Sequence, residues 1–595
     1  MSEIINSVLQ ARYFTKDEHS WEDVCKRVSN FIGNTDEERE RFYNLMVEGK
    51  FIPNSPTLFN AGLPNGQLSA CFVLPIHDSM ASIFETLGDC AQIFKSGGGC
   101  GFSFDELRQK NSPVGESNGV ASGAVSFMRV YDAAIESIKA GGRRRGAAMG
   151  VLPVTHGDIM DFVKCKTEEG QIRNFNISVM ITDDFMEKVK NKRFSDVVTH
   201  EILDDGSKRD VTVGEIWQSI VYGAWKNGEP GVLFDGNINK DNKLIKISPI
   251  KATNPCGEQP LLPYESCNLG SLNLSAYWKN GKFDDESFEK DVVTAVEFLN
   301  GVVDKNVFPI KELKAMNDET RKIGLGIMGY HDLLLKMRIP YDSEEAMAVL
   351  DGIMAKIRRV AERTSHLLAK RDGVFPAWEE SEWTMEVRNG GLLTIAPTGS
   401  ISLLANCSSG IEPVFNWVYK RRNTVGKEFL MVHPLFDADL RKMVMDDDAL
   451  YNEIINQVYS EGTLQNVDVL PQKVKDLYKC ALDIAPVWHI KTQATAQKHI
   501  DASISKTINL PEHASPADVA EIYIKAYDLG CKGITLYRTN SRRDVVLQNA
   551  QQQENGFVEV IKDGEIYVKC PECGGLTKGK GGCNVCEHCG FTKCS

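Results

Sequence analysis

The sequence predicts an α/β protein whose body contains parallel strands. Two observations carry this prediction: short apolar runs closed by Pro, Gly or Ser clusters recur from about residue 51, and helical patterns lie between them. Strands that alternate with helices in this way favour a parallel sheet covered by helices. The length of 595 residues indicates about four domain equivalents or one large barrel with additions.

The composition is that of an ordinary soluble chain. Hydrophobic residues make up 42% and charged residues 25%, which excludes a disordered or collagen-like protein. No run approaches the roughly 18 apolar residues that span a bilayer, and the N-terminus lacks the basic lead and apolar core of an export signal. The net charge of −13 argues against a broad nucleic-acid-binding surface. We therefore expect a cytoplasmic protein with no membrane and no nucleic-acid partner.

Residues 1–50 are expected to form an N-terminal helical segment. Apolar residues recur there at helical spacing, namely Trp21, Val24, Val28 and Phe31. Between residues 51 and 545 the apolar runs predict buried strands, for example at 71–74, 392–396 and 533–537. A capping-box signature from Ser82 to Glu85 predicts the start of a helix.

A polar stretch at 546–556 has the composition of a linker and separates the body from a tail, residues 557–595. The tail begins with a hairpin signal at Asp563-Gly564. Of the 16 cysteines in the chain, six fall in the last 26 residues. In a reducing compartment such a cluster favours metal ligation or redox chemistry over static disulfides.

Two C-x-x-C pairs of the tail can supply four thiolates from two tight turns, as a structural tetrahedral zinc site requires. The pairs are Cys570 with Cys573 and Cys583 with Cys586. In this register Cys589 and Cys594 form a separate dithiol. An alternative register uses Cys586 and Cys589 as the second zinc pair and leaves Cys583 and Cys594 unused. The sequence favours zinc but leaves the register open.

Two glycine-rich strings imitate nucleotide-binding motifs and are discounted. The string from Gly324 to Gly329 matches the dinucleotide fingerprint, but residues 316–322 before it predict no buried strand. The string from Gly574 to Lys580 imitates a P-loop, but Gly581 stands where the magnesium-binding Ser or Thr belongs.

Three further motifs of the body can carry chemistry, and each has a plain structural alternative. The loop Asn254-Pro-Cys256-Gly-Glu258 can present an amide, a thiol and a carboxylate on one face, or merely bury a cysteine. The turn from Pro397 leads to a predicted helix start at Ser400, which can bind an anion or simply cap the helix. The glycine-rich segments 96–101 and 141–146 can admit a ligand or form tight turns.

Together these segments resemble ribonucleotide reductase catalytic chains. Their order matches that of the family: Ser55-Pro-Thr, Ser69-Ala-Cys71, the Asn254 to Glu258 loop, Cys267, the turn 397–401 and the cysteine tail. The resemblance runs from about residue 51 to the C-terminus and is greatest to the class II, adenosylcobalamin-dependent enzymes. It implies a ten-stranded α/β barrel with a central finger loop, a small zinc-ribbon-like tail, and reduction of ribonucleotides for DNA precursor synthesis.

The resemblance also implies catalytic roles. Cys256 would be the thiyl radical that takes the ribose 3′ hydrogen, and Glu258 would be the general base on the 3′ hydroxyl. Asn254 would orient the substrate by a hydrogen bond. Cys71 and Cys267 would be the local reductants and would finish as a disulfide, because net reduction of the substrate requires two electrons.

Binding roles follow from the same resemblance. The substrate would be held by Ser55, Ala70, Cys71, Gly99, Asn254, Glu258 and the turn formed by Pro397, Thr398, Gly399, Ser400 and Ile401. Asp78 and Arg108 would bind a deoxynucleotide effector near helices within residues 78–150, across a homodimer contact. Cys589 and Cys594 would pass electrons from thioredoxin or a similar protein to the active site.

Class II fits better than the alternatives. A class I catalytic chain receives its radical from a second subunit through two adjacent tyrosines, whereas this chain reads Thr535-Leu-Tyr537-Arg538. Residues 1–50 are too short for an ATP-binding cone, so we expect no overall activity switch. The alternative functions are a class I-type large subunit with unusual radical transfer and a zinc-ribbon scaffold that binds nucleic acid. Diphosphate substrates are expected, although the sequence does not distinguish them from triphosphates.

Overall fold

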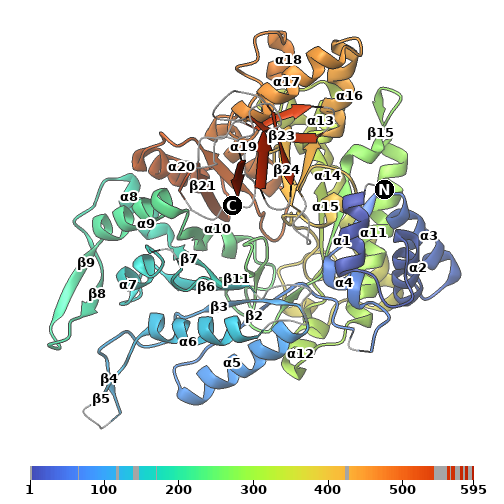
Figure 1. Cartoon of the computed structure of the whole chain (residues 1–595). Helices are drawn as coiled ribbons and strands as arrows, with labels where there is room; N and C mark the ends of the chain where they lie inside the picture. The colour runs from blue at the N-terminus through green and yellow to red at the C-terminus, as the bar shows by residue number, and fades with distance from the viewer. Residues whose placement is uncertain are drawn as a thin grey trace. The chain divides into compact units, whose positions relative to one another are not determined.

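The computed structural model describes residues 3–64, 66–115, 119–138, 147–168, 170–422 and 428–541, together with short strands of the tail (Figure 1). The chain divides into two compact units. The first comprises Met1–Leu333, Met347–Ile411 and Pro486–Ser541, and the second comprises Leu334–Ala346, Glu412–Ala485 and Arg542–Ser595.

Helices open the first unit. They are α1 (Glu3–Arg12), α2 (Trp21–Ile32), α3 (Asp36–Val47) and, after strand β1 (Phe51–Pro53), α4 (Ser55–Asn60). Helices α2 and α3 each begin with a capping box, in which Ser20 and Thr35 accept a backbone hydrogen bond. Trp21, Val24 and Val28 are buried on one face of α2, as the helical spacing predicts.

An eight-stranded sheet forms the centre of the first unit, in the order β13-β2-β3-β6-β7-β10-β21-β20. Its strands are β2 (Cys71–Leu74), β3 (Gly99–Ser103), β6 (Ala148–Pro153), β7 (Phe175–Ile181), β10 (Gly231–Phe234), β13 (Ser266–Cys267), β20 (Thr507–Leu510) and β21 (Gly533–Arg538). The five strands from β2 to β10 pair in parallel. Helices α5 (Met80–Lys95), α6 (Ala124–Ser137), α7 (Ile159–Lys164) and α9 (Val213–Asn227) alternate with them along the chain (Figure 1). The predicted α/β class is confirmed.

A three-stranded sheet joins β1, β14 (Leu269–Asn273) and β17 (Gly324–Met328). Asn268 alone separates β13 from β14, so the chain passes directly from the larger sheet to the smaller one. Beyond β17, isolated parallel bridges join Leu325 to Leu393 and Ile395 to Ile504. The segment 392–396, predicted as a strand, therefore pairs through these two bridges.

The central strands are mostly apolar because both of their faces are largely buried, although Asn176 of β7 is exposed. On one face Phe72 and Leu74 pack with the helices, and on the other Val73 packs with Ala252 and Leu261. Successive side chains of a strand point to opposite faces, so burial of both faces requires a continuous apolar run.

Two local predictions need correction or refinement. Helix α5 begins at Met80 with Ser79 as its cap, not at Ser82, because the Ser79 hydroxyl already accepts the Ser82 N–H at 3.1 Å. The discounted fingerprint at Gly324 is itself a buried strand, β17. A Cβ on Gly326 would lie 2.3 Å from the Thr394 carbonyl oxygen, so that glycine admits a neighbouring segment of the chain.

The second unit has its own core. It contains α16 (Pro434–Met443), α17 (Asp448–Glu461), α18 (Gln472–Leu477) and a hairpin of β18 (Val418–Arg422) with β19 (Glu428–Val432). Trp417 is buried at its centre, and the Trp417 Nε1–H donates to the Tyr478 carbonyl oxygen at 2.6 Å.

The tail contains a five-stranded antiparallel sheet. Its strands are β22 (Glu559–Lys562), β23 (Glu565–Lys569), β24 (Leu576–Lys580), β25 (Cys583–Cys586) and β26 (Thr592–Cys594). The pairing of β22 with β23 confirms the predicted hairpin. Residues 583–586 form a strand in place of the expected tight turn, and Cys583 lies opposite Cys594. The predicted linker, the basic segment 141–146, and Cys570, Cys573 and Cys589 lie outside the described residues.

Candidate active site

A cavity of about 180 Å³ in the first unit brings together residues from distant parts of the chain. Its lining contains most of the predicted substrate and catalytic residues: Ser55, Ala70, Cys71, Cys256, Glu258, Pro397, Thr398, Gly399, Ser400 and Ile401. Because motifs more than three hundred residues apart meet around one cavity, we take this cavity as the candidate active site.

Cys256 lies at the tip of a hairpin formed by β11 (Ala252–Thr253) and β12 (Pro260–Leu261). The Asn254 Oδ1 accepts the Gln259 backbone N–H at 3.0 Å and so closes the base of the tip. Gly257 has a φ of 79°, a left-handed conformation that glycine adopts without strain. The Cys256 thiol is exposed, whereas most of the other described cysteines are buried.

Strand β3 leaves room for this hairpin because its glycines lack side chains. A Cβ on Gly101 would lie 1.8 Å from the Thr253 carbonyl oxygen, and a Cβ on Gly99 would lie 3.0 Å from Pro255 Cγ. The glycine-rich segment therefore admits the chain's own loop. Gly99, predicted to contact substrate, packs against Pro255 and is not among the residues that line the cavity.

Asn254 and Glu258 are buried in the same hairpin, with 0% and 2% of their surface exposed. The Glu258 carbonyl oxygen accepts the Ser503 N–H at 2.8 Å and the Thr394 hydroxyl at 2.9 Å, which holds the backbone of Glu258 in place. The Asn254 Nδ2 is buried without an acceptor among the described residues. Asn254, predicted to orient the substrate, is therefore fully enclosed by the protein and is not among the residues that line the cavity.

Cys71 and Cys267 lie directly opposite each other in the antiparallel pairing of β2 and β13, and both are buried. The pKa of the Cys267 thiol is raised well above its usual value. Burial is the main cause, and the hydrogen bond with Cys71 is the second. The Ser69 and Ser266 hydroxyls, 3.0 Å apart, also link the two cysteine-bearing segments. This arrangement is a buried dithiol that can supply two electrons and two protons when it becomes a disulfide.

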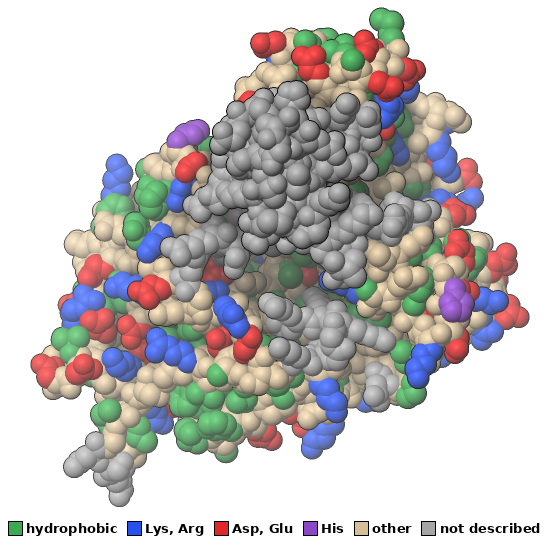
Figure 2. Space-filling model, in the orientation of Figure 1, with side chains coloured by type: hydrophobic (Ala, Val, Ile, Leu, Met, Phe, Trp, Pro, Cys, Tyr) green, Lys and Arg blue, Asp and Glu red, His purple; other side chains and the backbone are tan. Residues whose placement is uncertain are grey.

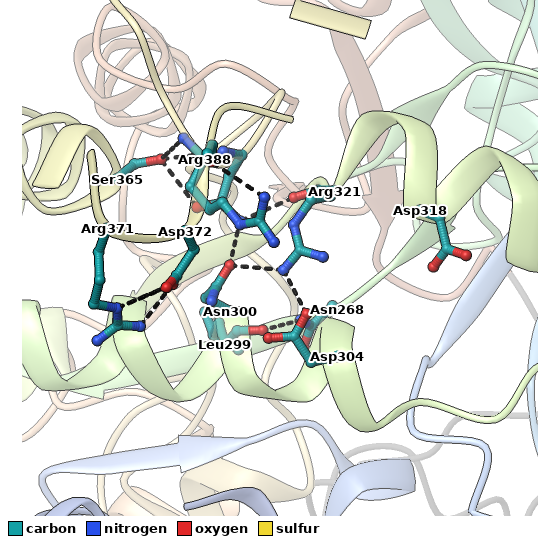
Figure 3. Close-up of polar contacts among 12 residues, drawn as sticks. Asn268, Leu299, Asn300, Asp304, Asp318, Arg321, Ser365, Arg371, Asp372 and Arg388 are labelled. Atoms are coloured by element: carbon teal, nitrogen blue, oxygen red, sulfur yellow. Dashed lines mark hydrogen bonds and ion pairs between the residues drawn. The ribbon is translucent and has the colours of Figure 1, made fainter. Parts of the chain in front are cut away.

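A polar network ties the Cys267 strand to the surrounding helices (Figure 3). The Asn268 Nδ2 donates to the Leu299 carbonyl oxygen at 2.6 Å on helix α11 (Asp285–Lys305). Asn300 follows Leu299 in the same helix, and its Oδ1 accepts a hydrogen bond of 3.0 Å from the Nη2 of the buried Arg321 (Figure 3). Such connected hydrogen bonds hold the dithiol on rigid elements.

We expect alkylation to distinguish these cysteines. At pH 7.5, iodoacetamide should modify Cys256 at least about tenfold faster than Cys267, because reaction requires an accessible thiolate. The raised folded-state pKa favours the neutral Cys267 thiol, so its contribution to stability is full below about pH 8.5 and falls as the pH rises further. Peptide mass mapping of a time course measures both rates, and equal rates at pH 7.5 would contradict the burial of Cys267.

The N-terminal helices contribute a wall of the cavity that the sequence analysis missed. Arg12 and Tyr13, at the end of α1, line it together with Asn54 and Phe59 from the α4 region. The Tyr13 and Ser55 hydroxyls are hydrogen-bonded at 2.9 Å. No spacing or motif pairs residue 12 with residue 54, so the sequence offered no signal for this wall.

Asp78 and Arg108 lie together away from the cavity lining. The Arg108 Nε donates to the Asp78 Oδ2 at 2.7 Å, just before helix α5. Met80 and Phe84 of α5 are 60% and 49% exposed, and Val130 of α6 is 39% exposed. Figure 2 shows hydrophobic side chains gathered along the lower edge of this face, over α5.

The described residues contain neither a membrane-spanning helix nor a cluster of metal ligands. None of the described helices combines the length and the apolar character that a membrane crossing needs. The described side chains contain no group of three or more potential metal ligands, and they do not include those of the tail cysteines.

Comparisons with known proteins agree with the geometry. A family profile described as "Ribonucleotide reductase, barrel domain" matches residues 69–388 and 385–537, and one described as "Ribonucleotide reductase, all-alpha domain" matches residues 2–66. A Thermoplasma acidophilum protein named vitamin B12-dependent ribonucleoside-diphosphate reductase is 46% identical over 543 residues, which is 89% of this chain and 69% of that protein. A Mycobacterium tuberculosis protein of the same name is 40% identical over 564 residues, which is 91% of this chain and 80% of that protein.

A solved structure shows the same fold. The Actinobacillus ureae class Id ribonucleotide reductase alpha subunit aligns with a TM-score of 0.75 at 24% identity, over 91% of this chain and 97% of that one. The matched profiles cover nearly all of residues 2–537, including every residue that lines the cavity. The chain therefore belongs to the ribonucleotide reductase family.

Proposed function

We propose that this protein reduces ribonucleoside diphosphates to 2′-deoxyribonucleotides by thiyl-radical chemistry that depends on adenosylcobalamin. The observation that carries the proposal is the one cavity lined by Cys256, Glu258 and Cys71, with Cys267 directly opposite Cys71. Membership of the family and the names of the relatives at 40% and 46% identity support the same oxidoreductase activity.

The residues around Cys256 fit a radical source that acts from outside the buried dithiol. The Cys256 thiol is exposed at the hairpin tip, so it can be reached while Cys71 and Cys267 stay buried. When bound, adenosylcobalamin supplies the radical equivalent through its cobalt–carbon bond.

The strand β21 argues against the class I alternative. Arg538 stands where a class I chain has the second of two adjacent tyrosines. Its Nε donates to the Trp225 carbonyl oxygen at 2.9 Å, and its guanidinium lies 4.5 Å from the centroid of the Trp225 ring. A guanidinium held in this way serves packing and does not relay an electron as a tyrosine does.

Each catalytic residue has one task in the proposed reaction. The Cys256 thiyl takes the 3′ hydrogen atom of the ribose, and the Glu258 carboxylate accepts the proton of the 3′ hydroxyl. The 2′ hydroxyl then leaves as water, protonated by a thiol of the Cys71–Cys267 pair. The pair becomes a disulfide as it supplies two electrons and its second proton, which form the new C2′–H bond, and Glu258 returns its proton to the 3′ oxygen. Cys256 finally returns the hydrogen atom to C3′, so it is regenerated in each cycle.

The proposal is tested with purified protein, CDP, dithiothreitol and an effector nucleotide, with and without adenosylcobalamin and with no second protein. We expect dCDP only when the cobalamin is present. Parallel reactions with CTP show which phosphate length is used. Turnover that requires a radical-generating subunit in place of the cobalamin would establish the class I alternative, and the absence of any product from CDP and CTP would overturn the proposal.

We infer that the two sheets of the first unit are parts of one ten-stranded barrel, within a catalytic domain of residues 51–545. Five parallel strands, β2 to β10, form one half. Parallel pairings and bridges link β21, β20, the segment 393–395, β17 and β14 into the other half. The direct passage from β13 to β14 supports closure of the ring, with the Cys256 hairpin as its finger loop.

We infer that Asp78 and Arg108 belong to an effector site beside a homodimer contact. Their ion pair lies next to α5, whose exposed Met80 and Phe84 suit burial against a second copy. Arg108→Gln should weaken stimulation by a deoxynucleotide at least about tenfold, because it removes a charged hydrogen-bond donor. Unstimulated CDP reduction should stay within about twofold, and Arg39→Gln, a change at a partly exposed arginine of α3, serves as the control. Full stimulation of the Arg108 variant would contradict the role.

We infer that the tail binds zinc and carries the thioredoxin-dependent dithiol. Two registers are compatible with its cysteines: the first has Cys570, Cys573, Cys583 and Cys586 on zinc with Cys589 and Cys594 as the dithiol. In the second register Cys586 and Cys589 form the second zinc pair beside Cys570 and Cys573, and Cys583 and Cys594 do not bind zinc. The strand at 583–586 and the pairing of Cys583 with Cys594 support the second register.

Substitution of single tail cysteines separates the registers. Cys594→Ser should abolish turnover with thioredoxin and spare turnover with dithiothreitol, because the small dithiol reaches the active site by itself. The Cys589→Ser variant should keep its zinc if the first register is right and lose it if the second is right. Mass spectrometry of the variant under non-denaturing conditions measures the bound zinc. Full thioredoxin activity of both variants would rule out the shuttle.

We also infer a cytoplasmic location. The structure forms no disulfide among the ten cysteines that it describes with their side chains, as a reducing compartment allows.

A further inference from the structure

We propose that Arg12 and Asn54 bind the diphosphate of the substrate, on the wall of the cavity that the N-terminal helices build. The inference rests on the proposed function and names the part of the substrate that this wall recognises. Both residues line the cavity. The residues that follow them, Tyr13 and Ser55, are joined by a hydrogen bond of 2.9 Å, which holds the end of α1 against the start of α4.

Asn54 presents an unused donor. Its Oδ1 accepts the Thr57 backbone N–H at 2.9 Å as the cap of helix α4. This bond fixes which end of the amide is oxygen, because the N–H of Thr57 needs an acceptor. The side chain is buried, with 6% of the residue exposed, and its Nδ2 has no acceptor among the described residues. A buried donor without a partner at the wall of a cavity suits an oxygen of a bound ligand.

Arg12 supplies positive charge to the wall of the cavity. Among the described residues that line the cavity it carries the one positive charge, and Glu258 carries the one negative charge. A nucleoside diphosphate adds further negative charge, which the Glu258 carboxylate repels. A guanidinium binds phosphate oxygens through two parallel N–H donors, so Arg12 can offset that charge directly.

The chemistry of this wall selects an anion. Arg12 and the Asn54 amide nitrogen are donors without acceptor capacity, and the Tyr13 and Ser55 hydroxyls can donate as well. A nucleobase presents both donors and acceptors and would need acceptors in return, whereas phosphate oxygens need donors alone. The N-terminal helices thus contribute to substrate binding as well as to packing.

Two substitutions test the proposal in the full-length protein. Asn54→Asp keeps the oxygen that caps α4 and replaces the donor by a negatively charged acceptor of nearly equal size. Arg12→Gln removes the charge. Each should raise KM for CDP about ten- to a hundredfold and change kcat by less than about threefold, because a charged hydrogen bond to the ground state is lost. Arg12→Lys should restore part of the affinity, and Lys16→Gln, an exposed neighbour outside the lining, should behave as wild type.

Equilibrium binding separates the possible causes. The variants should lose affinity for CDP but not for cytidine, and inorganic pyrophosphate should compete with CDP less well in Arg12→Gln. Equal losses for CDP and cytidine, or unchanged CDP binding in both variants, would overturn the proposal. Asn54→Ser keeps a capping oxygen, removes the amide donor and adds no charge. It therefore tests the role of the donor even if the aspartate variant folds poorly. If wild type binds CDP through these residues yet reduces nothing, the proposed function fails and the binding site stands.

Discussion

Cys256→Ala is expected to abolish ribonucleotide reduction, to below about one ten-thousandth of the wild-type rate, because it removes the thiol that takes the 3′ hydrogen in the proposed reaction. Cys71, the other thiol in the cavity lining, faces Cys267 and serves as a reductant in the proposed reaction. Cys256 is exposed, so its loss leaves no hole in the core. The variant should therefore unfold within about 1 °C of wild type. Product formation from CDP over hours, with the melting curve, measures both effects.

A matched control is Cys407→Ser. Cys407 is partly exposed and does not line the cavity, so its replacement tests whether loss of any reachable thiol matters. We expect it to keep at least about half of the activity, as surface substitutions usually do. Residual turnover of a few per cent in Cys256→Ala would show that another group starts the reaction.

Gly101→Ala is expected to disable the enzyme from a position outside the cavity lining. Its new Cβ would lie 1.8 Å from the Thr253 carbonyl oxygen, so the hairpin that carries Cys256 must move. A displacement of about 1 Å at a reacting group costs about a hundredfold in rate, and overpacking costs about 1–3 kcal/mol of stability. We therefore expect kcat to fall about a hundredfold and the first thermal transition to move to lower temperature.

Gly352→Ala is the matched control for this change. Gly352 lies inside helix α14 (Glu344–Asp372), and no described atom from outside its own turn lies within 4 Å of the position that the new methyl group would take. Alanine there should preserve activity and add about 0.5–1 kcal/mol of stability through the lower entropy of the unfolded chain. Normal turnover in Gly101→Ala would mean that the hairpin tolerates displacement and that its contact with β3 does not position Cys256.

The family could be recognised from the order of short motifs in the sequence. The loop that carries Cys256 and Glu258 keeps Asn254, Cys256 and Glu258 within five positions, so this motif can be identified without knowledge of the fold. The buried strands could be predicted as well, because burial on both faces requires continuous apolar runs such as 71–74. Helix α2 followed from the spacing of its buried residues.

Other features arose from packing between distant segments. Residues 12 and 54 line one cavity because the Tyr13–Ser55 hydrogen bond joins the end of α1 to the start of α4. Cys71 faces Cys267 because β2 pairs with β13 across almost two hundred residues. The glycines of β3 could be recognised as unusual, but the Thr253 carbonyl oxygen that requires Gly101 comes from another part of the chain. Local spacing encodes which residues share a helix face or a strand. Contacts between segments far apart depend on how the whole core packs, so the substrate wall of α1 and α4 became visible only in the folded protein.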